Sequence, residues 1–200
     1  MKKKIINIIT ENIKTLLGAL IIAIIIRSLI IQPFYIPSSS MEPTLLIGDR
    51  IFVSKYSYGY SKHSFPFSPN FSNERFFSKN PNQGDLVVFK TPADNRTDYI
   101  KRLIGMPGDE IQFKNGEIYI NDKLILRKKI NISYPIRCGK FSLKTNTYVE
   151  TLPNGVEHLA TYNIENTLQN TKKFKVPENH YFLMGDNRDC SKDSRFLEDV

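Results

Sequence analysis

Hydrophobic positions are densest near the N-terminus, where residues 13–31 contain only four polar side chains. A run of this length lets a helix cross about 30 Å of hydrocarbon. We therefore predict a transmembrane anchor over residues 13–33, with residues 1–12 in the cytoplasm because lysines crowd that side. Arg27 lies near the outer end of the run, where its side chain can reach the lipid headgroups.

A cleaved signal peptide is the alternative for this region. Residues 16–26 have the length of an h-region, and the small residues Ser38 and Ser40 lie two positions apart downstream. The apolar run continues past Arg27 to Ile31, however, which leaves these small residues far from its centre. This continuation favours an uncleaved anchor.

Behind the anchor, the pattern changes to short apolar or alternating runs bounded by turn residues, which is typical of β-strands. Such runs lie at 47–54, 84–90, 98–109, 110–120 and 181–184. Asn115-Gly116 predicts a tight hairpin, and Asn121-Asp122 marks the start of a second one. Residues 127–175 are polar with broken alternation, and we expect strands joined by loops there. The chain is therefore predicted to be mostly β.

Residues 56–83 break this pattern, because eight aromatic side chains stand among Ser, Asn, Pro and Lys without a helical or strand period. We expect a long irregular surface loop. A flap that dips into the membrane interface is the functional alternative, since aromatic side chains are enriched there.

The net charge of +8 is dispersed: four lysines less one glutamate give +3 before residue 16, and the other +5 is spread through the chain. We see no clustered basic stripe and expect no nucleic-acid partner, whereas anionic lipid is compatible with this charge. Cys138 and Cys190 are too few for a disulfide scaffold or a cysteine zinc site, and the sequence leaves their pairing open. His63, His158 and His180 are far apart, so no metal site is predicted.

Residues 36–45 follow the anchor and place three serines between Pro37 and Pro43. Each proline fixes its own φ and disfavours helical geometry before it, so we predict a stiff, non-helical loop. A Ser/Pro-rich linker is the simpler alternative. A nucleophilic serine needs a base, and no histidine has a suitable context. Lys101 is the best candidate, because burial among apolar neighbours lowers the pKa of a lysine toward neutrality; taken alone, a solvated lysine is the simpler interpretation.

The run 185–195, GDNRDCSKDSR, consists of small and charged residues that form tight turns and position charges. A surface loop of Asx-turns is the simpler interpretation of this run.

Four segments together resemble the motif boxes of bacterial type I signal peptidases (leader peptidases), a family of serine proteases with a Ser/Lys dyad. They are PSSSMEPTL at 37–45, GDLVVF at 84–89, YIKR at 99–102 with GMPGD at 105–109, and the run at 185–195. They occur in the family's order, and four boxes in register are far more specific than any one. With the anchor, the resemblance spans about residues 16–200.

The resemblance implies a fold and a set of catalytic roles. After the anchor it implies an extracytoplasmic coiled β-sheet domain of barrel-like character, with a catalytic part (34–120 and 179–200) and a variable β insertion (121–178). Ser40 matches the nucleophile and Lys101 the general base. The backbone N–H of Ser40 and the hydroxyl of Ser38 match the oxyanion hole, and Ser191 matches the serine that orients the lysine.

The resemblance implies further positions, a substrate and a location. Asp193 and Arg195 match a structural ion pair behind the site. Shallow pockets for small substrate side chains match Ile36, Met41, Leu45, Tyr99 and Ile100. The implied activity removes signal peptides from exported preproteins after Ala-X-Ala sequences, without metal or organic cofactor. The implied location is the bacterial inner (plasma) membrane, with a single span, a cytoplasmic N-terminus, a periplasmic catalytic domain and membrane lipid as a partner; the oligomeric state is left open.

Two departures and two rivals accompany this interpretation. Cys190 stands where the family commonly has Asn, and the family usually continues through a further strand where this sequence ends at Val200, so we expect a truncated or fragmentary chain. A membrane-tethered β-domain that binds ligands without chemistry would place Ser40 and Lys101 far apart. A self-cleaving Ser/Lys repressor would need a DNA-binding helix pair in place of residues 16–31.

Overall fold

The structure is a computed structural model that describes residues 2–65, 68–69, 74–132 and 135–196. The chain divides into two compact units. One contains residues 1–34 and 50–80, and the other contains residues 35–49 and 81–200.

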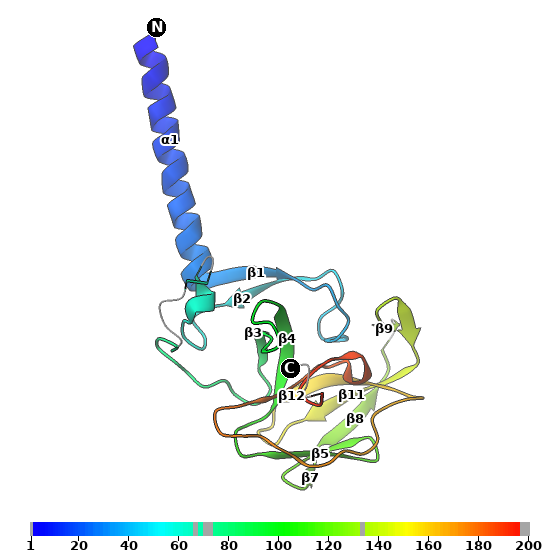
Figure 1. Cartoon of the computed structure of the whole chain (residues 1–200). Helices are drawn as coiled ribbons and strands as arrows, with labels where there is room; N and C mark the ends of the chain where they lie inside the picture. The colour runs from blue at the N-terminus through cyan, green and yellow to red at the C-terminus, as the bar shows by residue number, and fades with distance from the viewer. Residues whose placement is uncertain (1, 66–67, 70–73, 133–134, 197–200) are drawn as a thin grey trace. The chain divides into compact units, whose positions relative to one another are not determined.

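The first unit contains the apolar helix α1, Lys2–Ile25, which continues as a π-helical turn, η1, over Ile26–Ile30 (Figure 1). Residues 3–30 are long and apolar enough to cross a membrane, by length and composition. The helix begins well before residue 13, because the preceding polar residues are accommodated within it; the Thr10 hydroxyl, for instance, donates to the Ile6 carbonyl.

The rest of this unit is a two-stranded sheet with irregular segments. Strands β1, Ile31–Tyr35, and β2, Arg50–Ser54, pair with each other. The strand predicted within 47–54 is confirmed as β2. The irregular segment predicted over 56–83 is confirmed for its described residues, which contain only a 3-10 turn, η2, at Lys62–Ser64 and one bridge between Tyr60 and Phe76; residues 66–67 and 70–73 lie outside the described residues.

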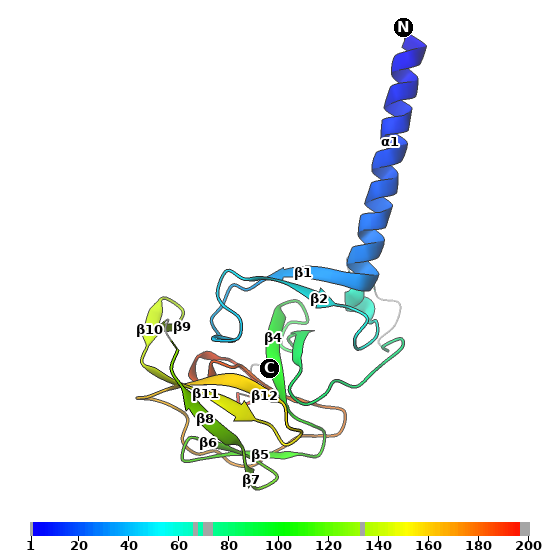
Figure 2. The same ribbon diagram turned by 180° about the vertical axis from the view of Figure 1, so that it is seen from behind.

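The second unit consists of small antiparallel sheets (Figures 1 and 2). Its strands are β3 Leu86–Lys90, β4 Asp98–Gly105, β5 Glu110–Lys114, β6 Glu117–Ile120, β7 Lys123–Leu124, β8 Leu126–Ile130, β9 Ile136–Cys138, β10 Phe141–Leu143, β11 Thr145–Thr151, β12 Glu157–Asn163, β13 Phe174–Lys175 and β14 Phe182–Met184. A 3-10 turn, η3, covers Arg188–Cys190. The sheet orders are β14-β4-β3, β13-β5-β6-β7, β12-β11-β8 and β10-β9. The prediction of a mostly β chain with an N-terminal apolar helix is confirmed.

Both predicted hairpins are present. β5 and β6 pair so that Lys114 faces Glu117, and the two connecting residues, Asn115 and Gly116, have φ of 51° and 74°. Positive φ at both positions is what the favoured two-residue turn requires. The Asn121-Asp122 turn leads into β7, which pairs with β6.

The core of the second unit lies between β4, β5, β6 and β14. Its buried apolar residues are Ile104, Ile111, Phe113, Ile118, Ile120, Ile125, Leu152, Val176, Phe182 and Met184. Because β4 and β14 both contribute to this core and pair with each other, the residues at their ends are held in fixed positions.

Candidate active site

The loop at 36–45 has no helix or strand, as predicted, and is closed by backbone hydrogen bonds. Ile36 N–H donates to the Asp49 carbonyl at 2.9 Å, and Gly48 N–H donates to the Ile36 carbonyl at 2.9 Å. Within the loop, Leu45 N–H donates to the Met41 carbonyl at 3.0 Å. These bonds hold the serines of the loop in one conformation.

Ser40 and Lys101 meet across this loop. Lys101 lies on β4, the central strand of the β14-β4-β3 sheet, and its Nζ is 2.7 Å from Ser40 Oγ. Lys101 is 4% exposed and Ser40 is 9% exposed. The prediction of a solvent-exposed Lys101, which the strand pattern alone would favour, is therefore wrong. The prediction that a linker Ser40 would lie far from Lys101 is also wrong.

Burial lowers the pKa of Lys101 from 10.5 to about 8. The carboxylates of Asp193 and Asp186 oppose this shift by favouring the charged amine, whereas the charge of Arg195 adds to it. A substantial fraction of the amine is therefore neutral near pH 8 and can accept a proton from Ser40.

Ser38 and Ser191 complete the hydroxyl cluster. Ser38 Oγ donates to Ser40 Oγ at 3.5 Å. Ser191 is 8% exposed, and its hydroxyl lies close enough to the Asp193 carboxylate to help lower the pKa of Asp193. A Cβ added to Gly185 would collide with both the Ser191 hydroxyl and the Ser40 carbonyl, so the backbone at Gly185 approaches both serines closely.

Asp193 and Arg195 form a buried ion pair. Arg195 Nε donates to Asp193 Oδ1 at 2.7 Å, and Asp193 also accepts the Gly185 N–H at 3.0 Å. Burial alone would raise the pKa of Asp193, but the hydrogen bond and charge of Arg195 outweigh it and lower that pKa. Arg195 also donates to the Arg188 carbonyl. The pair therefore fixes the turn that carries Ser191.

The predicted pocket residues differ in exposure. Ile36 is 3% exposed and Met41 has no exposed surface, whereas Leu45, Tyr99 and Ile100 are half-buried. Leu45, Tyr99 and Ile100 are therefore accessible from the surface, whereas Met41 is fully enclosed. A cavity of about 390 Å³ lies elsewhere in this unit, over β8, β11 and β12.

Asp186, which was not predicted as a site residue, connects three of the four boxes. Arg102 donates to its two carboxylate oxygens at 2.8 and 2.7 Å, and the Thr44 hydroxyl donates to it at 2.5 Å. Asp186 has no exposed surface. The run 185–195 is thus largely a buried scaffold, and the interpretation as a surface loop is wrong. The run contains Asp-x-Arg twice, at 186–188 and 193–195, and this pattern was the available sequence signal for buried ion pairs.

A second buried network lies behind this turn. Arg188 donates to Glu150 Oε2 at 2.8 Å, and its guanidinium lies 3.1 Å from both Tyr162 Oη and His158 Nε2. Tyr162 donates to the same Glu150 carboxylate. Sequence gave no signal for His158, because its partners are eight and thirty positions away.

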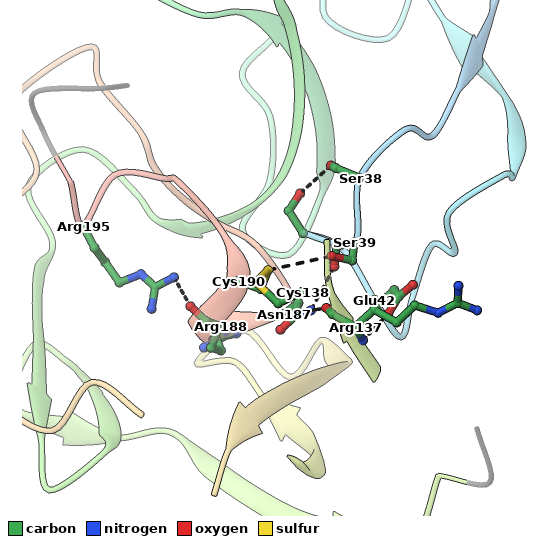
Figure 3. Close-up of a disulfide and its surroundings, with 10 residues drawn as sticks. Ser38, Ser39, Glu42, Arg137, Cys138, Asn187, Arg188, Cys190 and Arg195 are labelled. Carbon is green, nitrogen blue, oxygen red and sulfur yellow. Dashed lines mark hydrogen bonds between the residues drawn. A yellow bond between two sulfur atoms is a disulfide. The ribbon is translucent and has the colours of Figure 1, made fainter. Parts of the chain in front are cut away.

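The two cysteines form a disulfide beside the loop (Figure 3). Cys138 ends β9 and Cys190 ends η3, and the Ser39 hydroxyl lies 3.8 Å from Cys190 Sγ. The pairing that the sequence left open is therefore resolved. Among the described residues, no group of three or more His, Cys, Asp or Glu side chains could hold a metal ion.

Comparison with known proteins gives consistent matches. The family model described as "Signal peptidase, peptidase S26" matches residues 9–200. Signal peptidase I of Rickettsia typhi is 45% identical over 185 residues, which cover 87% of this chain and 68% of that protein. Signal peptidase I of Rickettsia conorii is 47% identical over 184 residues, which cover 87% and 67%. The crystal structure of a signal peptidase I from Enterococcus faecalis V583 matches with a TM-score of 0.33 and 28% identity, over 61% of this chain and 90% of that chain.

Proposed function

Because the chain belongs to the peptidase S26 family of signal peptidases and is a serine peptidase, we propose that it cleaves signal peptides with Ser40 as nucleophile and Lys101 as general base. The observation that carries this assignment is the 2.7 Å distance between Lys101 Nζ and Ser40 Oγ. The lowered pKa of the buried lysine supports it, since a base must be unprotonated.

The proposed reaction has two halves. Neutral Lys101 takes the hydroxyl proton of Ser40 as Oγ bonds to the scissile carbonyl carbon. Lys101 then gives this proton to the leaving amine, the C–N bond breaks, and an acyl-enzyme ester remains. A water molecule, deprotonated by Lys101, attacks the ester carbonyl carbon. The bond from this carbon to Ser40 Oγ breaks, Lys101 returns the proton to Oγ, and the acyl product leaves as a carboxylic acid.

The neighbouring residues receive supporting roles. The Ser40 backbone N–H and the Ser38 hydroxyl form the proposed oxyanion hole. Ser191 orients Lys101; its burial and the close approach of Gly185 to both Ser191 and Ser40, which keep its hydroxyl near the dyad, support this role. The pocket residues Ile36, Met41, Leu45, Tyr99 and Ile100 select small side chains of the Ala-X-Ala type.

The helix over residues 3–30 is the proposed single-span anchor, and membrane lipid is its partner. Lysines at the N-terminal end favour a cytoplasmic N-terminus and a catalytic domain on the periplasmic side of the inner membrane. Preproteins held by their own apolar segments would then be confined to the same membrane as the enzyme, which raises their effective concentration.

Cleavage of a preprotein in detergent tests the dyad. We expect wild type to cut after a small residue, and Ser40→Ala and Lys101→Met to lose cutting while they keep the wild-type circular dichroism spectrum. Lys129→Met, which changes an exposed strand lysine, is the matched control and should cut normally. Undiminished cutting by Lys101→Met would disprove the base assignment, and a folded wild type that does not cut would favour the binding-domain rival.

A further inference from the structure

The β9–β10 hairpin, residues 136–143, contacts the Ser40 loop through polar groups. The buried carboxylate of Glu42 accepts the Arg137 N–H at 2.9 Å (Figure 3). The Asn187 side chain donates to the Arg137 carbonyl at 2.7 Å and to the Ser39 carbonyl at 3.1 Å. The disulfide adds a covalent link between this hairpin and η3.

The η3 turn in addition holds the nucleophile. The Asn187 N–H donates to the Ser40 carbonyl at 3.1 Å, and the Cys190 N–H donates to the Asn187 carbonyl at 3.2 Å. Ser191 follows directly after Cys190. The turn around η3 thus contains one cysteine of the disulfide, the Asn187 N–H that binds Ser40, and the Ser191 hydroxyl.

Among the described residues, few other contacts hold the hairpin in place. Its two strands have three residues each and pair only with each other. Within the hairpin Ile136 is buried, whereas Phe141 is 77% exposed. An isolated two-stranded hairpin is marginally stable in water. The disulfide therefore acts together with the hydrogen bonds of Glu42 and Asn187 to fix β9 against the loop.

We propose that the Cys138–Cys190 disulfide is a redox-sensitive positioning element for Ser40, with Glu42 as its hydrogen-bonding counterpart; this inference rests on the proposed function. A dithiol reductant attacks one sulfur, the S–S bond breaks, and the reductant leaves as its own disulfide. The two cysteines gain two electrons and two protons. Both are half-buried, so a small dithiol reaches them. The pairing also gives a role to Cys190, which departs from the family's common Asn.

The full-length enzyme in detergent, with and without dithiothreitol, tests this proposal. Alkylation and mass spectrometry verify reduction, and cleavage of a preprotein gives kcat and KM. We expect reduction to lower kcat about 10- to 100-fold with KM within about twofold, since small misplacement of reacting groups costs up to about 10²-fold. The double variant Cys138→Ser/Cys190→Ser should have the kcat of the reduced enzyme, and dithiothreitol should not change it.

Glu42 supplies a second arm. Glu42→Ala should lower kcat in the oxidised enzyme, whereas Glu42→Gln, which keeps an acceptor for the Arg137 N–H, should restore most of it. Glu165→Ala is the matched control, because this exposed carboxylate pairs with an exposed lysine, Lys144, and with no other side chain among the described residues. It should leave kcat unchanged.

Hydrogen exchange separates failure of this inference from failure of the proposed function. Reduction should speed exchange of the Arg137 and Asn187 amides while those of the β5–β6 hairpin stay protected. Unchanged kcat or unchanged exchange after verified reduction would overturn the inference and leave the dyad intact. Faster exchange throughout β5 and β6 would overturn it in favour of general stabilisation. An oxidised, folded enzyme that does not cut would refute the proposed function. In that case the exchange data would still show whether the disulfide fixes the β9–β10 hairpin and the η3 turn.

Discussion

Arg102 donates two hydrogen bonds to Asp186, although 84 positions separate them. Arg102 follows Lys101 on β4, and Asp186 also accepts the Thr44 hydroxyl from the Ser40 loop. This one pair therefore ties the strand of the proposed base to the loop of the proposed nucleophile, which explains how two short segments keep a 2.7 Å contact.

Asp186→Asn should destabilise the second unit by about 3–5 kcal/mol, because it leaves a buried guanidinium without its counter-charge. The urea midpoint of unfolding, followed by circular dichroism, measures the change. Glu165→Gln, in an exposed pair with Lys144, serves as the control and should shift the midpoint little. Equal shifts of the urea midpoint in both variants would contradict a stabilising role for the buried Arg102–Asp186 pair.

The pH dependence of cleavage should follow Lys101. Since its pKa in the folded enzyme is lowered to about 8, the active neutral amine accumulates as pH rises through that value. We expect log(kcat/KM) to rise with a slope near one from about pH 6 and to level above about pH 8. Initial rates on one preprotein between pH 5.5 and 9.5 provide the measurement; a flat profile would argue against Lys101 as the base.

Local features were predictable from sequence wherever one segment determines them. The Asn115-Gly116 hairpin follows from two residues that tolerate positive φ, and the apolar helix follows from its composition. Ser40, Lys101, Asp193 and Arg195 were predicted as site residues because the four boxes resemble the motifs of a family.

Long-range partners were not predictable. Glu150 and His158 have no distinctive sequence context. Their contacts with Arg188 depend on how β11, β12 and η3 pack together. The disulfide likewise depends on packing, because Cys138 and Cys190 lie 52 positions apart and no local feature of either residue determines whether they pair.

Ser38→Ala should lower kcat by about 10²–10³ with little change in KM, since an oxyanion-hole donor acts mainly in the transition state. Steady-state kinetics at pH 8.5, where the lysine is largely neutral, isolate this effect. Ser39→Ala is the neighbouring comparison: its hydroxyl lies beside Cys190, and its loss should be much smaller. Equal losses would indicate general disturbance of the loop.

Gly185→Ala should reduce both cleavage and stability, because the new Cβ would meet the Ser40 carbonyl and the Ser191 hydroxyl. Overpacking of this kind typically costs about 1–3 kcal/mol. Gly155→Ala separates crowding from backbone effects, since Gly155 has φ of 86° but open space around its Cβ position. It should lose some stability and keep its kcat; a Gly185→Ala enzyme with normal kcat would contradict the close approach.

Glu150 should make stability depend on pH in the acid range. Burial alone would raise its pKa, but Arg188 and its other hydrogen-bond partners lower it from 4.5 to about 2. Because the folded pKa is below the unfolded one, the stabilisation is fully present above about pH 4.5 and is lost as pH falls toward 2. The shift corresponds to about 3 kcal/mol. Glu150→Gln should remove this dependence and also destabilise the protein at pH 7, where Arg188 loses its counter-charge. Urea unfolding of wild type and variant at pH 7, 5, 4 and 3 measures both effects, and parallel declines of the two proteins below pH 4.5 would show that the acid sensitivity arises elsewhere.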